Sequence, residues 1–351
     1  MPQGFQSRRM ERLVDNHDLW ESLEIAHYLD QRDLARFFGC SRLLWYSLAK
    51  SLPSLRAFDM LMCSSTSPPV RNYWDRVRQT LQHHGKTLKI IRIYIRRLWC
   101  SELPWQMIHM FAPHVQKVTI GTQRLFKHPV LFFVKVFLDE DHGMWPRDLE
   151  DVEFTHVDFT DPALGSGEGF RFPLPRWPRT FTFVHMIQLR RLALSWCNLS
   201  DVRVLAIMTW ADRLRYLPRL ETLELVNCKW SQRGIGALLW GLGAGRSDLD
   251  ILTLPPLRSM TLVPRNTGDI ISIVDAISVV NLLPKLTSLT RLTLRLSALS
   301  VKTLLDHASS PSLEELVLVD SEPAYHLVTD TEGQWTSRFP KLTSVRAVDA
   351  S

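Results

Sequence analysis

Several short stretches of the sequence contain the residue types that cofactor and metal sites use. The glycine-rich "GSGEGF" (165–170) and "GLGAGR" (241–246) lack the glycine spacing and the preceding strand of a phosphate-binding loop, and in the second the glycines are expected to end a helix. The acidic "DEDHG" (139–143) lacks the spacing of a calcium loop. His83 and His84 have no partners at metal-ligand spacing and are expected in an exposed loop. We therefore expect no cofactor and no bound metal.

The residues needed for nucleophilic catalysis are not arranged in a recognisable way either. There is no G-x-S-x-G nucleophile elbow and no cysteine with a histidine in a catalytic frame. The cysteines, which are scattered and odd in number, argue against a disulfide framework and against a zinc knuckle; they are Cys40, Cys63, Cys100, Cys197 and Cys228. We therefore expect a protein that is not an enzyme, with an enzyme on an unrecognised α/β fold as an alternative.

Composition and charge reduce the number of functional classes to which the protein could belong. The 351 residues are 45% hydrophobic and 22% charged, which is typical of a folded globular protein. The net charge of +6 is dispersed and accompanies no nucleic-acid-reading module, so no nucleic-acid partner is expected. The apolar run "VLFFVKVFL" (130–138) contains Lys135 and is too short for a membrane span, so no membrane partner is expected. The first twenty residues lack the apolar core of a secretion signal, which predicts a cytoplasmic and/or nuclear protein.

A repeat organises most of the chain. The segments 189–199 and 220–230 share the pattern L-x-x-L-x-L-x-x-C-x, with apolar residues closing both. Apolar triplets with the same opening spacing recur, and we expect each to mark a short strand. They begin at Leu55, Leu88, Val115, Leu149, Leu189, Leu220, Leu289, Leu313 and Leu342, with one more at either Leu249 or Leu257.

Hydroxyl residues follow at a fixed distance from the opening residue of several repeats. Ser200, Ser231, Ser300 and Thr160 stand eleven residues after it, where a hydroxyl can cap the start of a helix. Apolar residues at helical spacing follow two of them: Leu205, Met208, Ala211 and Leu214 after the first, and Ile235, Leu238, Leu239 and Leu242 after the second. Each unit is thus predicted to be a strand, a turn and a capped helix.

This arrangement resembles the leucine-rich-repeat family. The resemblance implies an α/β solenoid over residues 53–351, with parallel strands on the concave face and helices outside. An irregular Pro/Gly-rich insertion near 160–188, which contains Phe170, Phe172 and Trp177, is either a binding element or an ordered surface loop. Cys197 and Cys228 fall in neighbouring turns, where they are expected to be buried thiols that hydrogen-bond the turn backbone, with a disulfide as the alternative.

The N-terminal stretch "LEIAHYLDQRDLARFFGCSRLLW" resembles the F-box, a helical module that docks onto the adaptor of SCF-type cullin ubiquitin ligases. The matching residues are Ile25, Tyr28, Leu29, Asp30, Arg32, Asp33, Leu34 and Cys40. The resemblance implies an F-box-like helical module over 13–52 after a flexible segment 1–12. It also implies that the adaptor and its cullin are partners, and that the adaptor is bound by Ile25, Tyr28, Leu29, Asp30, Leu34, Phe38 and Cys40. His17, Asp18 and Trp20 stand where the family usually has Leu-Pro followed by Glu. Alternatively, the helix pair only caps the open end of the solenoid core.

An F-box followed by leucine-rich repeats resembles the substrate receptors of these ligases. The resemblance implies a non-catalytic recognition subunit whose concave sheet binds an unknown target protein. Successive side chains on a strand point to opposite faces of the sheet, so the residues between the core positions face outward. We predict that these outward residues bind the target. These are Arg92, Tyr94, Glu153, Arg191, Glu224, Arg291, Arg295 and Glu315, together with Asp151, Ser195 and Thr222. The alternative function is a protein-interaction scaffold without a ubiquitin role.

Overall fold

The computed structural model describes most of the repeat region of the chain. The described residues are 56–62, 68–95, 103–122, 146–156, 187–199, 214, 217–230, 232–243, 254–265, 273–319 and 337–348. The predicted F-box-like module (13–52), the insertion near 160–188 and the "DEDHG" stretch lie outside these residues.

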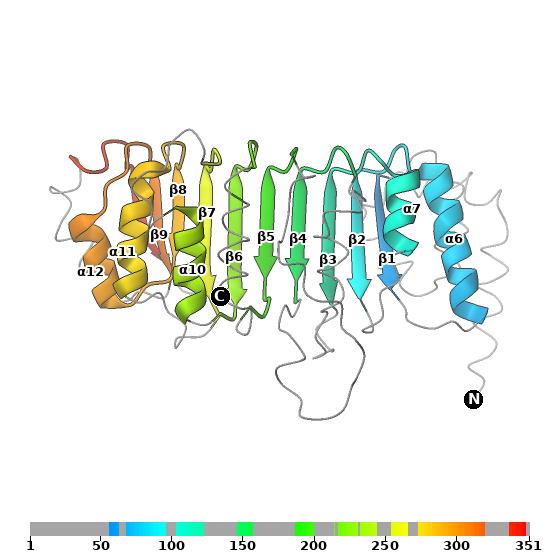
Figure 1. Ribbon diagram of the computed structural model, residues 1–351, viewed down its shortest axis with the longest axis horizontal. Coiled ribbons are helices and arrows are strands. Elements are labelled where there is room, and N and C mark those ends of the chain that lie inside the picture. Colours follow the sequence, from blue (N-terminus) through cyan, green and yellow to red (C-terminus); the bar gives the residue numbers. More distant parts are fainter. Residues whose placement is uncertain are drawn as a thin grey trace, which may run out of the picture.

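The described strands form one parallel sheet of ten strands, and the order of the strands in the sheet is their order in the chain (Figure 1). The strands are β1 (Ala57–Met62), β2 (Ile90–Ile95), β3 (Lys117–Thr122), β4 (Asp151–Thr155), β5 (Arg191–Ser195), β6 (Thr222–Cys228), β7 (Ser259–Pro264), β8 (Arg291–Leu294), β9 (Glu315–Val319) and β10 (Ser344–Val348). Each strand pairs only with its neighbours in the chain, as the predicted stack of repeats requires.

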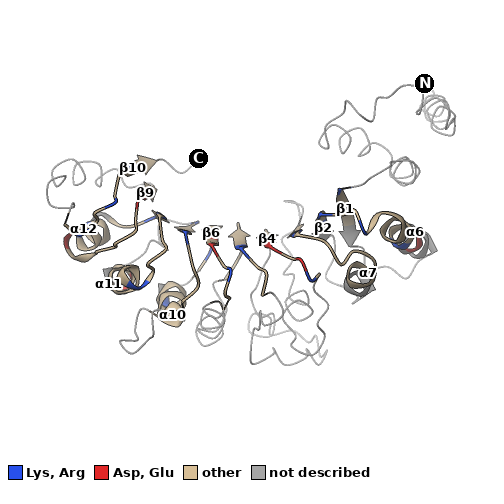
Figure 2. Cartoon of the chain, turned by 90° about the horizontal axis from the view of Figure 1, so that it is seen from above, with Lys and Arg blue, Asp and Glu red and all other residues tan. Residues whose placement is uncertain are grey.

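The described helices lie on one side of the sheet, which is the convex side of a curved molecule (Figure 2). They are α6 (Pro68–His84), α7 (Leu103–Phe111), α10 (Gln232–Leu242), α11 (Ile273–Leu282) and α12 (Ala298–His307), with a short 3-10 turn, Leu283–Lys285, after α11. None of them combines the length and the apolar character that crossing a bilayer needs. The sheet lines the concave side, so the predicted arrangement of strands inside and helices outside is confirmed.

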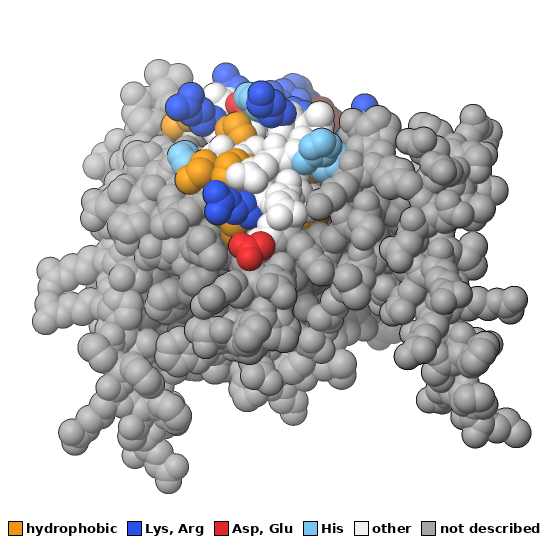
Figure 3. Space-filling view, turned by 90° about the vertical axis from the view of Figure 1, so that its right-hand side faces the viewer, with side chains coloured by type: hydrophobic (Ala, Val, Ile, Leu, Met, Phe, Trp, Pro, Cys, Tyr) orange, Lys and Arg blue, Asp and Glu red, His pale blue; other side chains and the backbone are white. Residues whose placement is uncertain are grey.

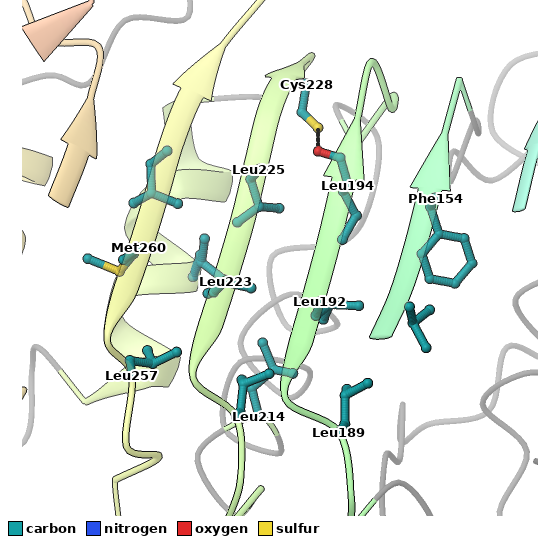
Figure 4. Close-up of a cluster of buried hydrophobic side chains, with 14 of the residues drawn as sticks. Phe154, Leu189, Leu192, Leu194, Leu214, Leu223, Leu225, Cys228, Leu257 and Met260 are labelled. Atoms are coloured by element: carbon teal, nitrogen blue, oxygen red, sulfur yellow. Dashed lines mark hydrogen bonds between the residues drawn. The ribbon is translucent and has the colours of Figure 1, made fainter. Parts of the chain in front are cut away.

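The core lies between the sheet and these helices and is made of the predicted triplets. Leu189, Leu192 and Leu194 in the repeat of β5 are buried, and the equivalent leucines of β6 pack beside them (Figure 4). The choice left open between Leu249 and Leu257 is decided in favour of Leu257, because Met260 pairs in register with Leu223, and Leu262 pairs with Leu225. Each repeat therefore adds one layer of side chains to a continuous core.

The predicted buried thiols are confirmed. Cys197 and Cys228 are both free and buried, and each donates to a carbonyl of the preceding repeat. The Sγ of Cys197 lies 3.5 Å from the Phe154 oxygen. The Sγ of Cys228 lies 3.3 Å from the Leu194 oxygen, and Figure 4 shows this second hydrogen bond. The two cysteines thus link neighbouring turns without a disulfide.

The predicted cap of α12 is wrong by three residues. The N-cap is Ser297, whose Oγ accepts a hydrogen bond from the backbone N–H of Ser300 at 3.2 Å. Ser300 lies inside the first turn and is fully buried, with its Oγ 2.7 Å from that of Ser297. An N-cap residue directly precedes the first helical residue, and its side chain accepts a hydrogen bond from the backbone N–H of the third helical residue. Ser297 has this position in α12, whereas Ser300 is itself the third helical residue. The other predicted caps, Thr160, Ser200 and Ser231, lie outside the described residues.

The helix predicted after Ser231 is confirmed as α10, whose apolar residues Ile235, Leu238 and Leu239 are buried. It ends at Leu242, directly before a glycine, as expected: Gly243 has a φ of 118°, a conformation that residues with a side chain rarely adopt. Of the helix predicted after Ser200, only Leu214 is described; it is helical and buried.

The two histidines predicted in an exposed loop instead form the last turn of α6. His83 is exposed and His84 is buried, with their ring centroids 4.6 Å apart in an edge-to-face contact. Figure 3 views this end of the solenoid, where the described surface gathers histidine and basic side chains. Within the described ranges there is no group of three or more His, Cys, Asp or Glu that could hold a metal ion.

Candidate binding surface on the concave sheet

The residues that face away from the core form rows across the concave sheet, because neighbouring strands are paired without a shift along most of their length. The first row contains Lys117, Asp151, Arg191 and Thr222, on β3 to β6. The third row contains Thr119, Glu153, Ala193 and Glu224 on the same strands. Figure 2 shows the acidic positions on β4 and β6. Neighbours in a row lie about 4.8 Å apart across the strands, so opposite charges can pair directly.

These rows hold a connected group of charges, which we call the central network: Lys117, Asp151, Glu153, Arg191 and Glu224. The Nζ of Lys117 lies 2.8 Å from a carboxylate oxygen of Asp151. Arg191 donates to the other oxygen of Asp151 at 2.9 Å and to Glu224 at 2.6 Å. Glu153 lies farther from both cations, 3.6 Å from Lys117 and 3.8 Å from Arg191. The central network therefore contains three carboxylates and two cations.

Arg191 is the residue that joins the network. Its side chain is 29% exposed and contacts carboxylates on both neighbouring strands. Burial lowers the pKa of its guanidinium, but the hydrogen bond to Glu224 and the attraction of Asp151 and Glu224 outweigh burial and raise the pKa above its ordinary value. Arginine is effectively always protonated in proteins, so Arg191 is a permanent cation at this position. It holds the carboxylates of β4 and β6 in fixed positions.

A second, smaller group of charges lies on the last strands of the sheet. The Nε of Arg291 on β8 lies 3.2 Å from a carboxylate oxygen of Glu315 on β9, and Arg346 on β10 contacts the other oxygen of Glu315. The side chain of Glu315 is 18% exposed, so it is the most buried member of this group. With two cations and one carboxylate, this group has the opposite net charge to the central network.

The structure places most of the predicted target-binding residues on the concave side. Glu153, Arg191 and Glu224 belong to the central network, and Arg291 and Glu315 belong to the second group. Arg92, Ser195 and Thr222 lie at outward positions of β2, β5 and β6 and are half-buried. Tyr94 is in β2, but its side chain lies outside the described residues.

Arg295 differs from the expectation of an exposed contact residue. It is 7% exposed, and its Nη1 donates to the backbone oxygens of Pro264 at 3.0 Å and Arg265 at 3.2 Å. It follows β8, which ends at Leu294, and its guanidinium binds the turn that ends β7. Arg295 was predicted to contact the target protein, but it instead stabilises the turn at the end of β7.

The sequence prediction missed two members of these groups, Lys117 and Arg346. Both stand at outward strand positions, and both pair with a carboxylate one strand away. Aligning the weak repeats at 115 and 342 in register with their neighbours would have found them. All of the predicted adaptor-binding residues lie outside the described part of the chain; they are Ile25, Tyr28, Leu29, Asp30, Leu34, Phe38 and Cys40.

The strand order, the register and the buried triplets together decide the architecture. The fold is a leucine-rich-repeat-like solenoid. No protein-family model and no curated protein matches the chain. Among solved structures, the crystal structure of the TLR13–ssRNA13 complex is similar, with 13% sequence identity and a TM-score of 0.40 over 85% of this chain. The matched part is 35% of that chain, so the present chain spans about a third of its length.

The arrangement of the concave sheet is suited to recognition. Its charged side chains are held by partners on neighbouring strands, so fewer rotamers remain to be ordered when a ligand binds. From β2 to β9, each strand beneath them pairs with a neighbour on both sides and buries its core-facing side chains, which holds the backbone of the surface in place. Specificity on such a surface depends on the pattern of charges, because exposed pairs add little affinity by themselves.

Proposed function

We propose that this protein is a non-catalytic substrate-recognition subunit of an SCF-type cullin ubiquitin ligase. In this proposal the concave sheet binds a target protein and the N-terminal segment 13–52 docks onto the adaptor. The observation that carries the first part is the pre-ordered set of charges on a rigid, curved sheet, centred on Arg191. The second part is supported by the F-box-like sequence alone, through residues such as Leu29 and Leu34.

The role of such a subunit is to hold a target near an enzyme. Binding both the adaptor and the target on one chain would raise the effective concentration of the target at the ligase without any bond being made or broken by this protein. A shape-complementary concave face with fixed charges would favour partners of matching charge and reject others. The alternative is a scaffold that binds proteins through the same face and has no ubiquitin role.

Adaptor docking is tested by co-purification of the full-length chain with the adaptor and cullin from a eukaryotic lysate. We expect both to be retained by the unchanged chain and lost when Leu29→Glu and Leu34→Glu are combined, because charges on an apolar helix face oppose its burial against adaptor helices. Arg36→Glu is the control, since it changes charge at a polar position of the predicted helix that contains Leu34 and should leave retention intact.

The folded state of each variant is read separately by circular dichroism and thermal unfolding. Retention of the adaptor by the double-glutamate variant would contradict docking through this segment. A folded, unchanged chain that retains no adaptor would support the scaffold. Unfolding of the solenoid in the double variant would instead favour the capping role of the helix pair.

A further inference from the structure

The strands β4, β5 and β6 end in an unusual backbone conformation. His156, Trp196 and Asn227 have φ angles of 56°, 57° and 53°, in the left-handed region. Each residue continues or borders the ladder of backbone hydrogen bonds: the N–H of His156 donates to the Ser195 oxygen, and that of Trp196 donates to the Val226 oxygen, both at 2.9 Å. In β5 and β6 the next residue is a buried cysteine, so this conformation turns the chain back toward the core.

The turn explains the left-handed backbone conformation, but it does not explain why a tryptophan is present at position 196. Left-handed φ is common for glycine and asparagine, is adopted by histidine more often than by most residues, and is a rare outlier for a bulky side chain. Asn227 shows that asparagine satisfies the same turn one strand away. Trp196 is 39% exposed, so its side chain is not part of the core. Strain retained at an exposed aromatic residue points to a role in binding.

The neighbouring side chains hold the indole in place. The rings of His156 and Trp196 are parallel within 2°, with their centroids 5.9 Å apart. The guanidinium carbon of Arg265 lies 5.4 Å from the centroid of the Trp196 ring, so the arginine reaches across β6 from the end of β7. We call the four residues His156, Trp196, Asn227 and Arg265 the aromatic ledge. It is a fixed platform of one indole, one imidazole and one cation, at the edge marked by the arrowheads in Figure 1.

Among the described residues, the charge at this edge has one sign. The described residues that end β4 to β7 are 155–156, 195–199, 226–230 and 263–265, and among them there is no Asp or Glu. Lys229 and Arg265 are exposed and form no salt bridge with a residue of the described part. At the opposite edge of the same strands, Arg190 lies 3.9 Å from Glu150 and 3.6 Å from Glu221, so the charge of this arginine is compensated.

We propose that the aromatic ledge, with Lys229 beside it, binds an acidic segment of a partner protein. Carboxylates of such a segment would pair with Arg265 and Lys229, and the indole would cover the apolar parts of neighbouring side chains. This inference rests on the proposal that the chain is a protein-binding receptor, and it names the chemistry of the partner.

A protein segment fits this edge better than a nucleic-acid backbone. Glu153 and Glu224 stand three residues before His156 and Asn227 on the same strands, which places them about 10 Å from the ledge. A nucleic-acid strand carries a phosphate on every nucleotide and would meet these carboxylates wherever it extended over the sheet. A short acidic stretch can instead end at the ledge and continue with neutral or basic residues over the central network.

The proposal is tested with the full-length chain and fluorescein-labelled peptides of equal length that carry glutamate, glutamine or lysine at the same positions. Anisotropy measures their affinities at low and at physiological salt. We expect the glutamate peptide to bind best, and Arg265→Glu to lower its affinity about tenfold or more, since the substitution replaces an attraction with a repulsion. Arg258→Glu is the matched control, because Arg258 is exposed at the opposite end of β7 and the change of charge is identical.

A second variant separates binding from folding. Trp196→Asn keeps the turn and relieves the strain, so it should weaken binding of the glutamate peptide while changing the unfolding temperature little. The proposal is overturned if Arg258→Glu weakens binding as much as Arg265→Glu, or if the glutamine or lysine peptide binds as well as the glutamate peptide. It is also overturned if a single-stranded oligonucleotide binds more tightly than the glutamate peptide and loses affinity in Arg265→Glu.

The outcome is independent of adaptor docking. The peptide assay contains no adaptor and reads the ends of β4 to β7, whereas co-purification reads residues 13–52. Loss of the adaptor with intact peptide binding would leave an acidic-segment-binding scaffold, and the reverse result would leave a receptor whose target binds elsewhere on the sheet.

Discussion

The central network on β3 to β6 and the aromatic ledge at the ends of β4 to β7 share three strands and carry charge in opposite ways. In the central network, cations and carboxylates alternate across β3 to β6, and Arg191 contacts carboxylates on both sides. At the aromatic ledge, Arg265 and Lys229 have no described carboxylate to pair with, and the cation of Arg265 lies over an indole. Charges that pair with one another hold the side chains of a surface in place, whereas cations without a carboxylate partner can pair with the carboxylates of another protein. Within about 10 Å of strand, the sheet therefore carries one surface whose charges are paired internally and one whose described cations have no carboxylate partner.

The largest effect on the free energy of unfolding is expected from a core residue that lies beneath both regions. Leu194 is buried on β5, between Phe154 and Leu225 in the register, and precedes Trp196 by two residues. Leu194→Ala should lower the free energy of unfolding by about 2–5 kcal/mol, because it leaves a cavity in a packed layer. Urea denaturation measures the change. Ser195→Ala, at the next and outward-facing position, should change it by less than about 0.5 kcal/mol, and equal effects of the two variants would contradict a core that continues beneath both regions.

A smaller effect is expected when the central network is broken. Arg191→Ala leaves Asp151, Glu153 and Glu224 with Lys117 as the remaining cation, and should cost about 1–3 kcal/mol, less than a fully buried pair because Arg191 is partly exposed. The loss should shrink in high salt, where repulsion among the carboxylates is screened. Arg190→Ala, one residue earlier and half-exposed, is the control, with an expected change below about 0.5 kcal/mol.

Urea denaturation at two salt concentrations measures both arginine variants. If Arg190→Ala and Arg191→Ala destabilise equally, the central network has no special part in ordering the sheet, and the contrast with the ledge is lost.

The smallest effect on stability is expected at the ledge. In Trp196→Asn, relief of left-handed strain of about 1 kcal/mol opposes the loss of contacts with Arg265 and His156, which are worth a similar amount. The free energy of unfolding should therefore change by less than about 1 kcal/mol, measured by thermal and urea denaturation. A loss above about 2 kcal/mol would mean that the indole supports the fold, and would remove the distinction between the two regions.

Much of the fold could be predicted from the sequence because the repeat pattern fixes which residues face the core. Once the triplets are aligned, the register places Arg191 opposite Thr222 and therefore diagonal to Glu224, with which it pairs although the two are far apart in the chain. The choice between Leu249 and Leu257 could not be made, because both offer the same spacing and only pairing with β6 distinguishes them.

The errors arose where backbone geometry decides the outcome. The cap of α12 was placed at Ser300 because a shared offset was taken as a shared role, but the first helical residue determines which serine can cap. The ledge was missed because the repeat pattern contains no information on φ. Asn227 directly before Cys228 was the available signal, since asparagine favours the left-handed region, and alignment would then have placed Trp196 in the same conformation.

The order of the strands has a mechanical consequence. Because each described strand pairs only with its chain neighbours, a pull on the ends of the described solenoid would load the repeats one after another, since no strand pairing in this part of the chain joins repeats that are not adjacent. β10 at one end has no buried residue, whereas β9 beside it is almost wholly buried. The solenoid should therefore peel from β10 inward, and the central strands that carry the network and the ledge are among the last to part.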